Sequence, residues 1–218
     1  MLSPEEQAEV ARATEGVRQA ALNALAADRS GSFAIRFIAN LQRGVDQVLQ
    51  AALASGLKID CKPGCSHCCS ARVDALDPEV FRIAAELKKR PPAALATLTE
   101  RLRAHAARAQ GTTAQTHRMP CPLLEQNLCT VYEVRPANCR KAHSLDVGQC
   151  ATRGAEIPQR LDVLLKAEAL CKGSADAYGH VGLVAAGHEL GQALLLALTD
   201  PGAEARWMNG EAVFDRID

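Results

Sequence analysis

The sequence predicts a mainly α-helical protein, a single helical domain with a small β-hairpin and long loops. The composition is alanine-rich and only 3% aromatic, which favours helices over sheet. Apolar residues recur at helical spacing on both sides of the chain's middle, where such periodicity is weak. Eight of the nine cysteines fall in that middle part, in two groups about fifty residues apart. We therefore expect helices at both ends to enclose cysteine-bearing loops.

The N-terminal 57 residues predict a helical hairpin. Ser3-Pro4-Glu5-Glu6 is typical of a helix start, with Ser3 as N-cap and Glu6 completing a capping box. Helical periodicity continues to about Ala27. A second helix is expected from about Ser32 until Gly56, the residue type that commonly ends a helix.

Residues 58–150 form the cysteine-bearing region. After the first cysteine group, an extended piece is expected over 71–76 and helices beginning at Asp77-Pro78 and Pro91-Pro92. The polar segment 111–117 predicts a mobile loop. Within 121–132, two short apolar runs around a turn-like Glu125-Gln126-Asn127 predict a small β-hairpin.

Residues 151–218 are expected to form C-terminal helices that pack on this region in one compact domain. One helix should run from Pro158 to about Cys171 and a longer one from about Ala175 to Leu198. Four glycines in the longer helix predict close packing against another helix: Gly179, Gly182, Gly187 and Gly191. Trp207 and Phe214 should anchor the tail.

The cysteines carry the clearest chemical signal. Thiolates are soft ligands that select zinc, iron–sulfur clusters or copper(I), and a structural zinc site uses four of them. Eight thiols are too many for one zinc, so two zinc sites, or a [4Fe–4S] cluster with additional ligands, fit the count better. Adjacent Cys68 and Cys69 point in different directions and can serve two metals. The predicted metal ligands are Cys61, Cys65, Cys68, Cys69, Cys121, Cys129, Cys139 and Cys150.

The remaining candidates are weaker. Cys171 stands apart in a helical context and is expected to pack as a small apolar residue. His67 and His143 are additional ligand candidates, although lone histidines are more often structural. His180 and His188 are expected on one helical face, in the core. Basic residues near the thiols should favour thiolates and offset their charge: Lys62, Arg72, Arg135, Arg140 and Lys141.

Composition and sequence pattern indicate the cellular compartment and the classes of partner that we expect. The formal net charge is zero and aromatic residues are few, which argues against nucleic acid as a partner. Neither a basic, apolar export signal nor a membrane-length apolar run is evident. An odd cysteine count argues against a closed disulfide framework. We expect a cytoplasmic protein with reduced thiols.

The spacing of Cys61, Cys65 and Cys68 is also that of radical S-adenosylmethionine enzymes. Those enzymes carry the motif after the first strand of a β/α barrel. The sequence has no alternation of strands and helices that would build such a barrel, which argues against this class.

The combined motif resembles the YkgJ-type cysteine-cluster family, described as zinc- or iron-chelating domains and related to flagellin N-methylase. The resemblance rests on Cys61…Cys65-x₂-Cys68-Cys69, on Cys121-Pro122-Leu123-Leu124, and on the run from Cys129 to Arg140. Three residues separate Cys61 from Cys65, whereas the family pattern has two. The resemblance implies metal chelation.

Two function classes follow. The first is a cytosolic metal-binding protein whose cysteines hold an iron–sulfur cluster or zinc for structure, redox sensing or metal handling. The second is a metal-dependent protein lysine N-methyltransferase that uses S-adenosylmethionine, an activity credited to some relatives. No G-x-G-x-x-G loop or other nucleotide cradle supports the second class. Whether the chain is an enzyme, and whether it has a protein partner or substrate, stays open at this point.

Overall fold

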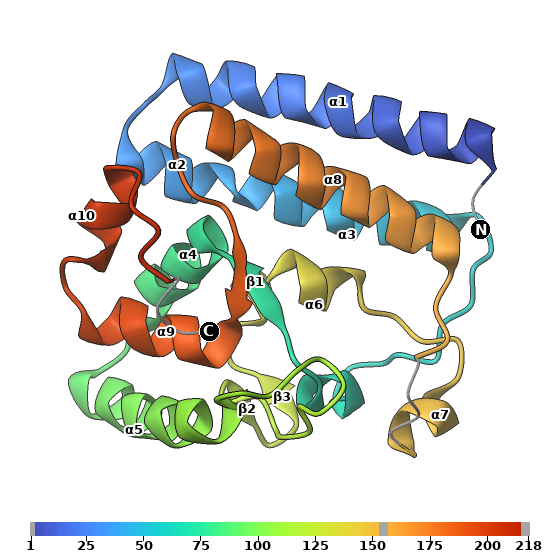
Figure 1. Ribbon diagram of the computed structural model, residues 1–218. Coiled ribbons are helices and arrows are strands. Elements are labelled where there is room, and N and C mark those ends of the chain that lie inside the picture. Colours follow the sequence, from blue (N-terminus) through green and yellow to red (C-terminus); the bar gives the residue numbers. More distant parts are fainter. Residues whose placement is uncertain (1–2, 153–156, 215–218) are drawn as a thin grey trace.

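The computed structural model describes residues 3–152 and 157–214 of the 218-residue chain. Most of these residues lie in helices around two small antiparallel sheets, which confirms the predicted mainly α fold (Figure 1). The longer helices are α1 (Pro4–Ala27), α3 (Ala39–Ala54), α4 (Asp77–Leu87), α5 (Pro92–Ala109), α8 (Leu161–His180) and α9 (Leu190–Thr199). The shorter ones are α2 (Gly31–Phe37), α6 (Ala137–Lys141), α7 (Val147–Ala151), α10 (Ala203–Met208) and the 3₁₀ turns η1 (His67–Ser70) and η2 (Tyr132–Val134). The strands are β1 (Asp74–Leu76), β2 (Leu124–Glu125), β3 (Leu128–Cys129) and β4 (Gly187–Glu189).

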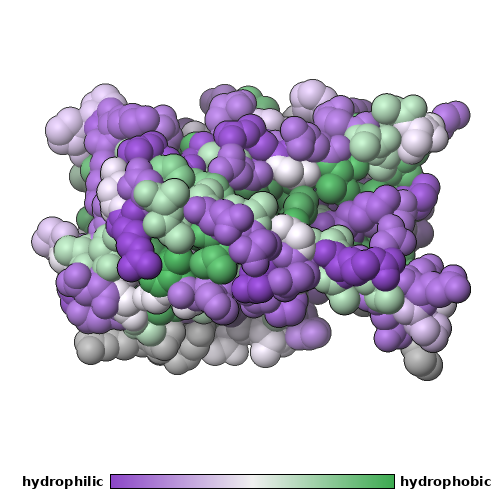
Figure 2. All heavy atoms as spheres, turned by 90° about the horizontal axis from the view of Figure 1, so that it is seen from above, coloured by the Kyte–Doolittle hydropathy of each residue, from purple (hydrophilic) through white to green (hydrophobic). Residues whose placement is uncertain are grey.

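Helix α1 begins with the predicted capping box. The Ser3 hydroxyl accepts a hydrogen bond from the Glu6 N–H at 3.2 Å, and the Glu6 carboxylate accepts one from the Ser3 N–H at 2.7 Å. The helix then lies along α8 at the edge of the molecule (Figure 1). Seen from above, the face that includes α1 carries mostly hydrophilic side chains with smaller apolar patches between them (Figure 2). Helix α1 is therefore an outer layer over α8.

The predicted second helix is two helices. The chain turns at buried Ile38, which separates α2 from α3. The turn lets α2 pack against α4, while α3 packs against α8 and α6.

The predicted long helix over 175–198 is wrong. Helix α8 continues to His180, and Gly182, at φ +83°, lies in the turn that follows. Strand β4 then pairs antiparallel with β1, opposing Asp74 to Glu189 and Leu76 to Gly187, before α9 begins. The extended piece expected over 71–76 thus has a partner from the far end of the chain.

The glycine prediction is only partly correct. A Cβ at Gly191 would lie 2.3 Å from the His105 ring, so α9 does approach α5 closely there. Added Cβ atoms at Gly179 and Gly182 would meet nothing within 4 Å, and Gly187 is in β4. A close approach that the sequence analysis did not predict is at Gly173 of α8, where a Cβ would lie 2.5 Å from a backbone atom, the Thr14 carbonyl oxygen of α1.

The predicted β-hairpin near Cys121 to Tyr132 is confirmed. Strands β2 and β3 pair Leu124 with Cys129, and Gln126 and Asn127 at the turn have φ of 49° and 64°. Positive φ at both central residues is the geometry of tight hairpin turns. The preceding polar segment 111–117 is a loop, as predicted, of hydrogen-bonded turns that bury its last residue, His117, and its mobility stays a prediction.

Aromatic residues join the C-terminal segment to the core. Phe81 of α4 packs against Trp207 and Phe214 with ring centroids 5.2 Å apart in both pairs. The Trp207 Nε1–H donates to the Val184 carbonyl oxygen at 2.7 Å. Trp207 and Phe214 therefore anchor the tail as expected.

The division into regions 1–57, 58–150 and 151–218 stays a proposal, and residues 153–156 and 215–218 of the last region lie outside the described part. Across residues 3–152 and 157–214, no helix combines the length and apolar character needed to cross a lipid bilayer.

Candidate metal centre

The two cysteine groups lie side by side. The Cys121 N–H donates to the Cys69 carbonyl oxygen at 2.7 Å, so the backbones of the two groups are in direct contact. A second link joins the loop and the hairpin turn, where the Ser66 hydroxyl donates to the Asn127 side-chain oxygen at 3.1 Å. Residues more than fifty positions apart in sequence are thus in direct contact.

A third backbone segment brings Cys150 to the same site. The Asp60 N–H donates to the Ser144 carbonyl oxygen at 2.9 Å, and the Ser144 N–H points at the Cys61 sulfur at 3.3 Å. The Asp60 carboxylate accepts from the Val147 N–H, the first residue of α7, at 3.0 Å. Helix α7 carries Cys150 and packs against η1, which carries Cys68 and Cys69.

The thiols form two overlapping sets. Burial raises the pKa of Cys61, and neighbouring Cys65, Cys68 and Cys150 raise it further. Burial also raises the pKa of Cys139, and the thiols of Cys121, Cys68 and Cys129 add to that shift. Charge interactions reach further in a low-dielectric interior than in water, so these effects indicate which thiols share a region and not how far apart their sulfur atoms are. Among the described residues, no three thiols lie within 4.8 Å of one another. The first set consists of Cys61 and the thiols that act on it, and the second of Cys139 and the thiols that act on it, with Cys68 in both.

Cys69 completes the group of eight. A hydrogen bond with the Cys69 thiol is the main cause of a raised pKa at Cys68, followed by burial. Burial also raises the pKa of Cys121 to about 11. Because their pKa values are raised, these thiols keep their protons when no metal ion is bound. A metal ion that binds these sulfurs must displace the protons, which couples its binding to pH.

Cys171 stands apart from this group. It lies in the middle of α8, not at a helix end as predicted, and packs against the hydrophobic core. Burial raises the pKa of its thiol, and the charges that act on it come from Lys141, Glu168 and Glu79. Its surroundings agree with the predicted packing role.

The histidines differ from one another. Both His143 ring nitrogens are paired, since Nδ1 is 2.9 Å from the Lys141 carbonyl oxygen and Nε2 accepts from the Arg160 N–H at 2.9 Å. One neutral tautomer satisfies both contacts, so His143 has a structural role here. His67 lies exposed in η1. The shared helical face predicted for His180 and His188 is wrong, because His180 ends α8 and His188 is buried in β4.

Most of the basic residues near the thiols are paired with carboxylates. Arg72 contacts Asp74 at 2.8 Å, Lys141 contacts Glu168, and both Arg135 and Arg140 contact Asp46 of α3. Buried Arg140 also donates to the Glu133 carbonyl oxygen at 2.6 Å and to the Arg135 carbonyl oxygen at 2.8 Å. Arg140 therefore organises the backbone between Glu133 and Cys139, a structural role that the sequence interpretation did not include.

Glu79 is a second residue that the sequence analysis missed. Its buried carboxylate accepts from the Ala137 N–H at 2.7 Å, from the Gln42 side chain at 3.1 Å and from the Leu76 N–H at 3.2 Å. It thereby holds the start of α6, the helix that carries Cys139. Its place three residues after Leu76 is the signal that could have revealed the Leu76 contact.

Comparison with known proteins agrees with this site. The model of the CxxCxxCC family, whose description is "Putative zinc- or iron-chelating domain", matches residues 60–169, just over half of the chain. No curated protein and no solved structure matches the chain. The matched segment contains all eight clustered cysteines. The chain therefore belongs to the CxxCxxCC family of zinc- or iron-chelating domains.

Proposed function

We propose that the eight clustered cysteines hold a metal–thiolate centre that contains an iron–sulfur cluster and serves a structural or redox role. The observation that carries this proposal is the contact between three cysteine-bearing backbone segments, through Cys121 and Cys69, through Ser144 and Cys61, and between α7 and η1. Thiolates are the ligands that iron–sulfur clusters and structural zinc use. Isolated packing cysteines would not gather in this way.

The two overlapping sets suggest two four-thiol shells. One shell would use Cys61, Cys65 and Cys150, and the other Cys121, Cys129 and Cys139. Cys68 and Cys69 each complete one shell, since adjacent side chains project in different directions. Each shell then has the four thiolates that either one zinc ion or one cluster requires.

One sequence feature favours iron over zinc. Solvent exposure does not decide between the metals, because Cys61 is exposed and the other seven cysteines are half-buried. Cys121 is followed directly by Pro122, as in the cysteine runs of bacterial ferredoxins. The family description names both zinc and iron, so the alternative is that the eight cysteines bind two zinc ions.

Metal and sulfide analysis of protein purified without oxygen tests the choice. The proposal predicts a brown protein with visible charge-transfer absorption and with iron and acid-labile sulfide in similar amounts. Zinc at two ions per chain without sulfide would overturn the iron–sulfur assignment and keep the thiolate centre. Protein with neither metal after reconstitution would overturn both.

An S-adenosylmethionine-dependent lysine N-methyltransferase activity rests on the family resemblance alone. We do not carry it into the proposal, because no contact described above favours it.

A further inference from the structure

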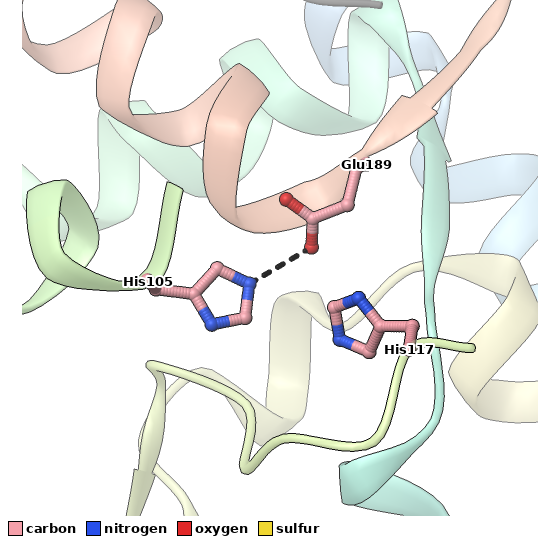
Figure 3. A group of neighbouring side chains, drawn as sticks. All are labelled: His105, His117 and Glu189. Carbon is pink, nitrogen blue, oxygen red and sulfur yellow. Dashed lines mark hydrogen bonds and ion pairs between the residues drawn. The ribbon is translucent and has the colours of Figure 1, made fainter. Parts of the chain in front are cut away.

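Three buried side chains outside the cysteine shells converge on one another (Figure 3). His105 comes from α5, His117 from the turns that follow α5, and Glu189 from β4. Their exposed fractions are 1%, 2% and 3%. One nitrogen or oxygen atom from each residue lies within 4.8 Å of the other two. We refer to these residues as the His–His–Glu triad.

The spacing within the triad suits a shared ion. His105 Nε2 and Glu189 Oε1 are 3.1 Å apart. Two atoms bound to one ion at about 2.1 Å lie about 3.0 Å apart at a right angle and about 3.4 Å apart at a tetrahedral angle. This pair already has the separation of two ligands. A ligand atom of His117 lies within 4.8 Å of those of His105 and Glu189.

The hydrogen bonds of Thr112 orient His117 for this role. The Thr112 hydroxyl has a single hydrogen, which it donates to the Ala109 carbonyl oxygen at 2.7 Å. The same oxygen lies 3.2 Å from His117 Nδ1, so it accepts from an Nδ1–H. The unprotonated Nε2 of that tautomer has a free lone pair. An outer hydrogen bond that sets the tautomer is typical of metal-binding histidines.

His105 is left incompletely satisfied by the protein alone. Its Nδ1 is buried and, within the described structure, has no hydrogen-bond partner. In His143, by contrast, both ring nitrogens are paired. A metal bond at Nε2 would place the ring proton on Nδ1 and leave that N–H without an acceptor, so the unpaired Nδ1 is not an argument for the ion, which rests on the geometry of the three side chains.

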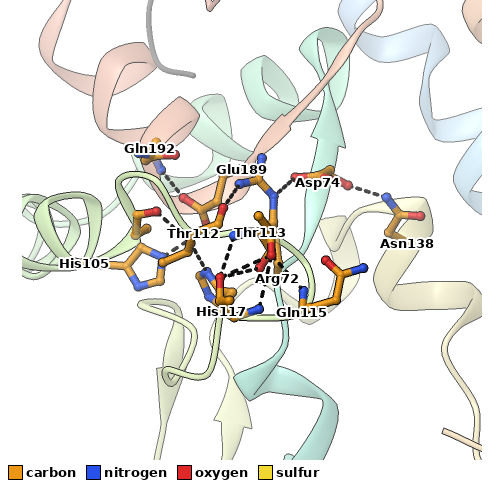
Figure 4. A network of polar contacts seen from close by, with 12 residues as sticks. Arg72, Asp74, His105, Thr112, Thr113, Gln115, His117, Asn138, Glu189 and Gln192 are labelled. Carbon is orange, nitrogen blue, oxygen red and sulfur yellow. Dashed lines mark hydrogen bonds and ion pairs between the residues drawn. The ribbon is translucent and has the colours of Figure 1, made fainter. Parts of the chain in front are cut away.

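The surrounding residues keep the triad in place (Figure 4). A Cβ at Gly191 would lie 2.3 Å from His105 Cδ2, so only glycine leaves room for the ring. The second Glu189 oxygen accepts from the Gln192 N–H at 2.8 Å. Arg72 donates to the Thr112 carbonyl oxygen at 3.0 Å while it pairs with Asp74. Elements from three parts of the chain thus support the three side chains.

We propose that His105, His117 and Glu189 form a binding site for a divalent transition-metal ion, Zn²⁺ or Fe²⁺, separate from the cysteine shells. Two imidazoles and one carboxylate are the ligands of mononuclear zinc sites and of non-haem Fe²⁺ sites. Three protein ligands leave at least one coordination position for water or a substrate. The site uses no thiol, so it can be tested independently of the cysteine centre.

The triad nevertheless adjoins that centre. His117 precedes Cys121 by four residues, and the charge of Glu189 contributes to the raised pKa of Cys121, whose main cause is burial. A mononuclear ion would therefore be held next to the second thiol shell. Both centres could then act on one reaction or one electron path.

Cobalt titration of chelator-treated protein under reducing, oxygen-free conditions tests the proposal. Co²⁺ bound by thiolates gives a strong sulfur-to-metal charge-transfer band, whereas Co²⁺ in the triad gives only weak d–d bands. Wild type should bind one Co²⁺ per chain that shows only the weak d–d bands. The variants His117→Gln and Glu189→Gln should weaken this site by more than about 100-fold, because loss of an outer partner alone costs about 10–100-fold.

Three further variants separate a ligand from a structural residue. Thr112→Val, which removes only the partner of His117 Nδ1, should weaken Co²⁺ binding by about 10–100-fold. His188→Gln is the control, because His188 is a buried histidine next to Glu189 in β4 but is not part of the triad. This variant should bind as much Co²⁺ with weak d–d bands as wild type. Cys129→Ser should lose charge-transfer intensity and keep the d–d bands.

The proposal is overturned if folded His117→Gln binds the same amount of thiol-free Co²⁺ as wild type. It is also overturned if every bound Co²⁺ shows sulfur charge transfer. If the ligand variants do not fold, unchanged affinity in Thr112→Val contradicts the assignment. Failure of the cysteine centre would instead remove only the charge-transfer band.

Discussion

Two carboxylates outside the cysteine motifs hold the backbone of the second motif. Asp46 of α3 pairs with Arg135 and Arg140, and Glu79 of α4 accepts from the Ala137 N–H. Both contacts end on the segment that leads into Cys139. The positions of the thiols therefore depend on residues that have no metal chemistry of their own.

Glu79 should make stability depend on pH. Burial raises the pKa of its carboxyl group above the usual value, against the opposing effect of its hydrogen bonds. The folded state then binds more protons than the unfolded state, so stability falls as pH rises from about 4 through the raised pKa. Glu79→Gln cannot ionise and should lack this decline, which has a slope of at most about 1.4 kcal/mol per pH unit.

Urea unfolding of both proteins between pH 4 and 8 measures the effect. Exposed Glu125 is a control of opposite sign, because a hydrogen bond from Arg101 lowers its pKa. The stability that ionised Glu125 contributes is lost as pH falls. The difference in stability between wild type and Glu125→Gln should therefore be smallest at low pH. Parallel pH curves for wild type and Glu79→Gln would contradict the role given to Glu79.

At this scale, sequence reasoning proposed the cysteines as ligands and missed the residues that hold their backbone. Cysteines are identified by their spacing alone, since eight of nine cluster in two short stretches. Glu79, Asp46 and the triad are brought to their places by packing between distant elements. His105 and Glu189 are 84 residues apart, and single histidines and glutamates give no pattern that marks such a meeting.

At the scale of elements, the contact between α1 and α8 depends on one glycine. An added Cβ at Gly173 would lie 2.5 Å from the Thr14 carbonyl oxygen and 2.9 Å from the Val17 Cβ. Backbone atoms cannot move aside as a flexible side chain would. The two helices must separate if this position carries any side chain.

Gly173→Ala should destabilise the protein by about 1–3 kcal/mol, the usual cost of overpacking. For a chain of this size, that corresponds to a fall of roughly 2–12 °C in the melting temperature. Gly179→Ala is the matched control in the same helix, because a Cβ there meets nothing within 4 Å. It should stabilise by up to about 1 kcal/mol through helix propensity. Equal melting temperatures for the two variants would contradict the close approach.

The elements that sequence reasoning mispredicted share one cause. Apolar spacing over 175–198 fits a helix, yet β4 pairs with β1 across more than a hundred residues. Short apolar runs do not distinguish a strand from a helix, and the partner strand is not visible locally. The break at Ile38 likewise follows from the separate contacts of α2 and α3. Helices with strong local signals, such as α1 with its Ser3-Pro4 start, were predicted well.

At the scale of the whole molecule, metal should order the middle of the chain more than its ends. Residues 58–75 and 117–150 contain mostly short elements and hydrogen-bonded loops, so ligand bonds would supply much of their order. Hydrogen exchange on metal-free and metal-loaded protein measures this. We expect protection in these two segments to fall on metal removal while α1 and α8 change little. Equal protection in both states would contradict the prediction.

The overall architecture was predictable because its main determinants are local. Helix starts, the hairpin turn and the cysteine groups all leave short-range patterns, and the core anchors Trp207 and Phe214 are rare aromatic residues in the tail. What could not be predicted is how the pieces meet. The link between Cys69 and Cys121, the approach of Cys150 through Asp60 and Ser144, and the triad all arise from tertiary contacts.

Metal content of single cysteine variants, purified without oxygen, tests the central claim most directly. A serine hydroxyl stays protonated near neutral pH and is a poorer ligand for soft metals. Cys68→Ser, Cys129→Ser and Cys139→Ser should each lower the metal per chain markedly. Cys171→Ser should keep it nearly at the wild-type level, because that thiol lies in the middle of α8 and packs against the hydrophobic core. Loss of metal in Cys171→Ser together with full occupancy in Cys129→Ser would contradict the account.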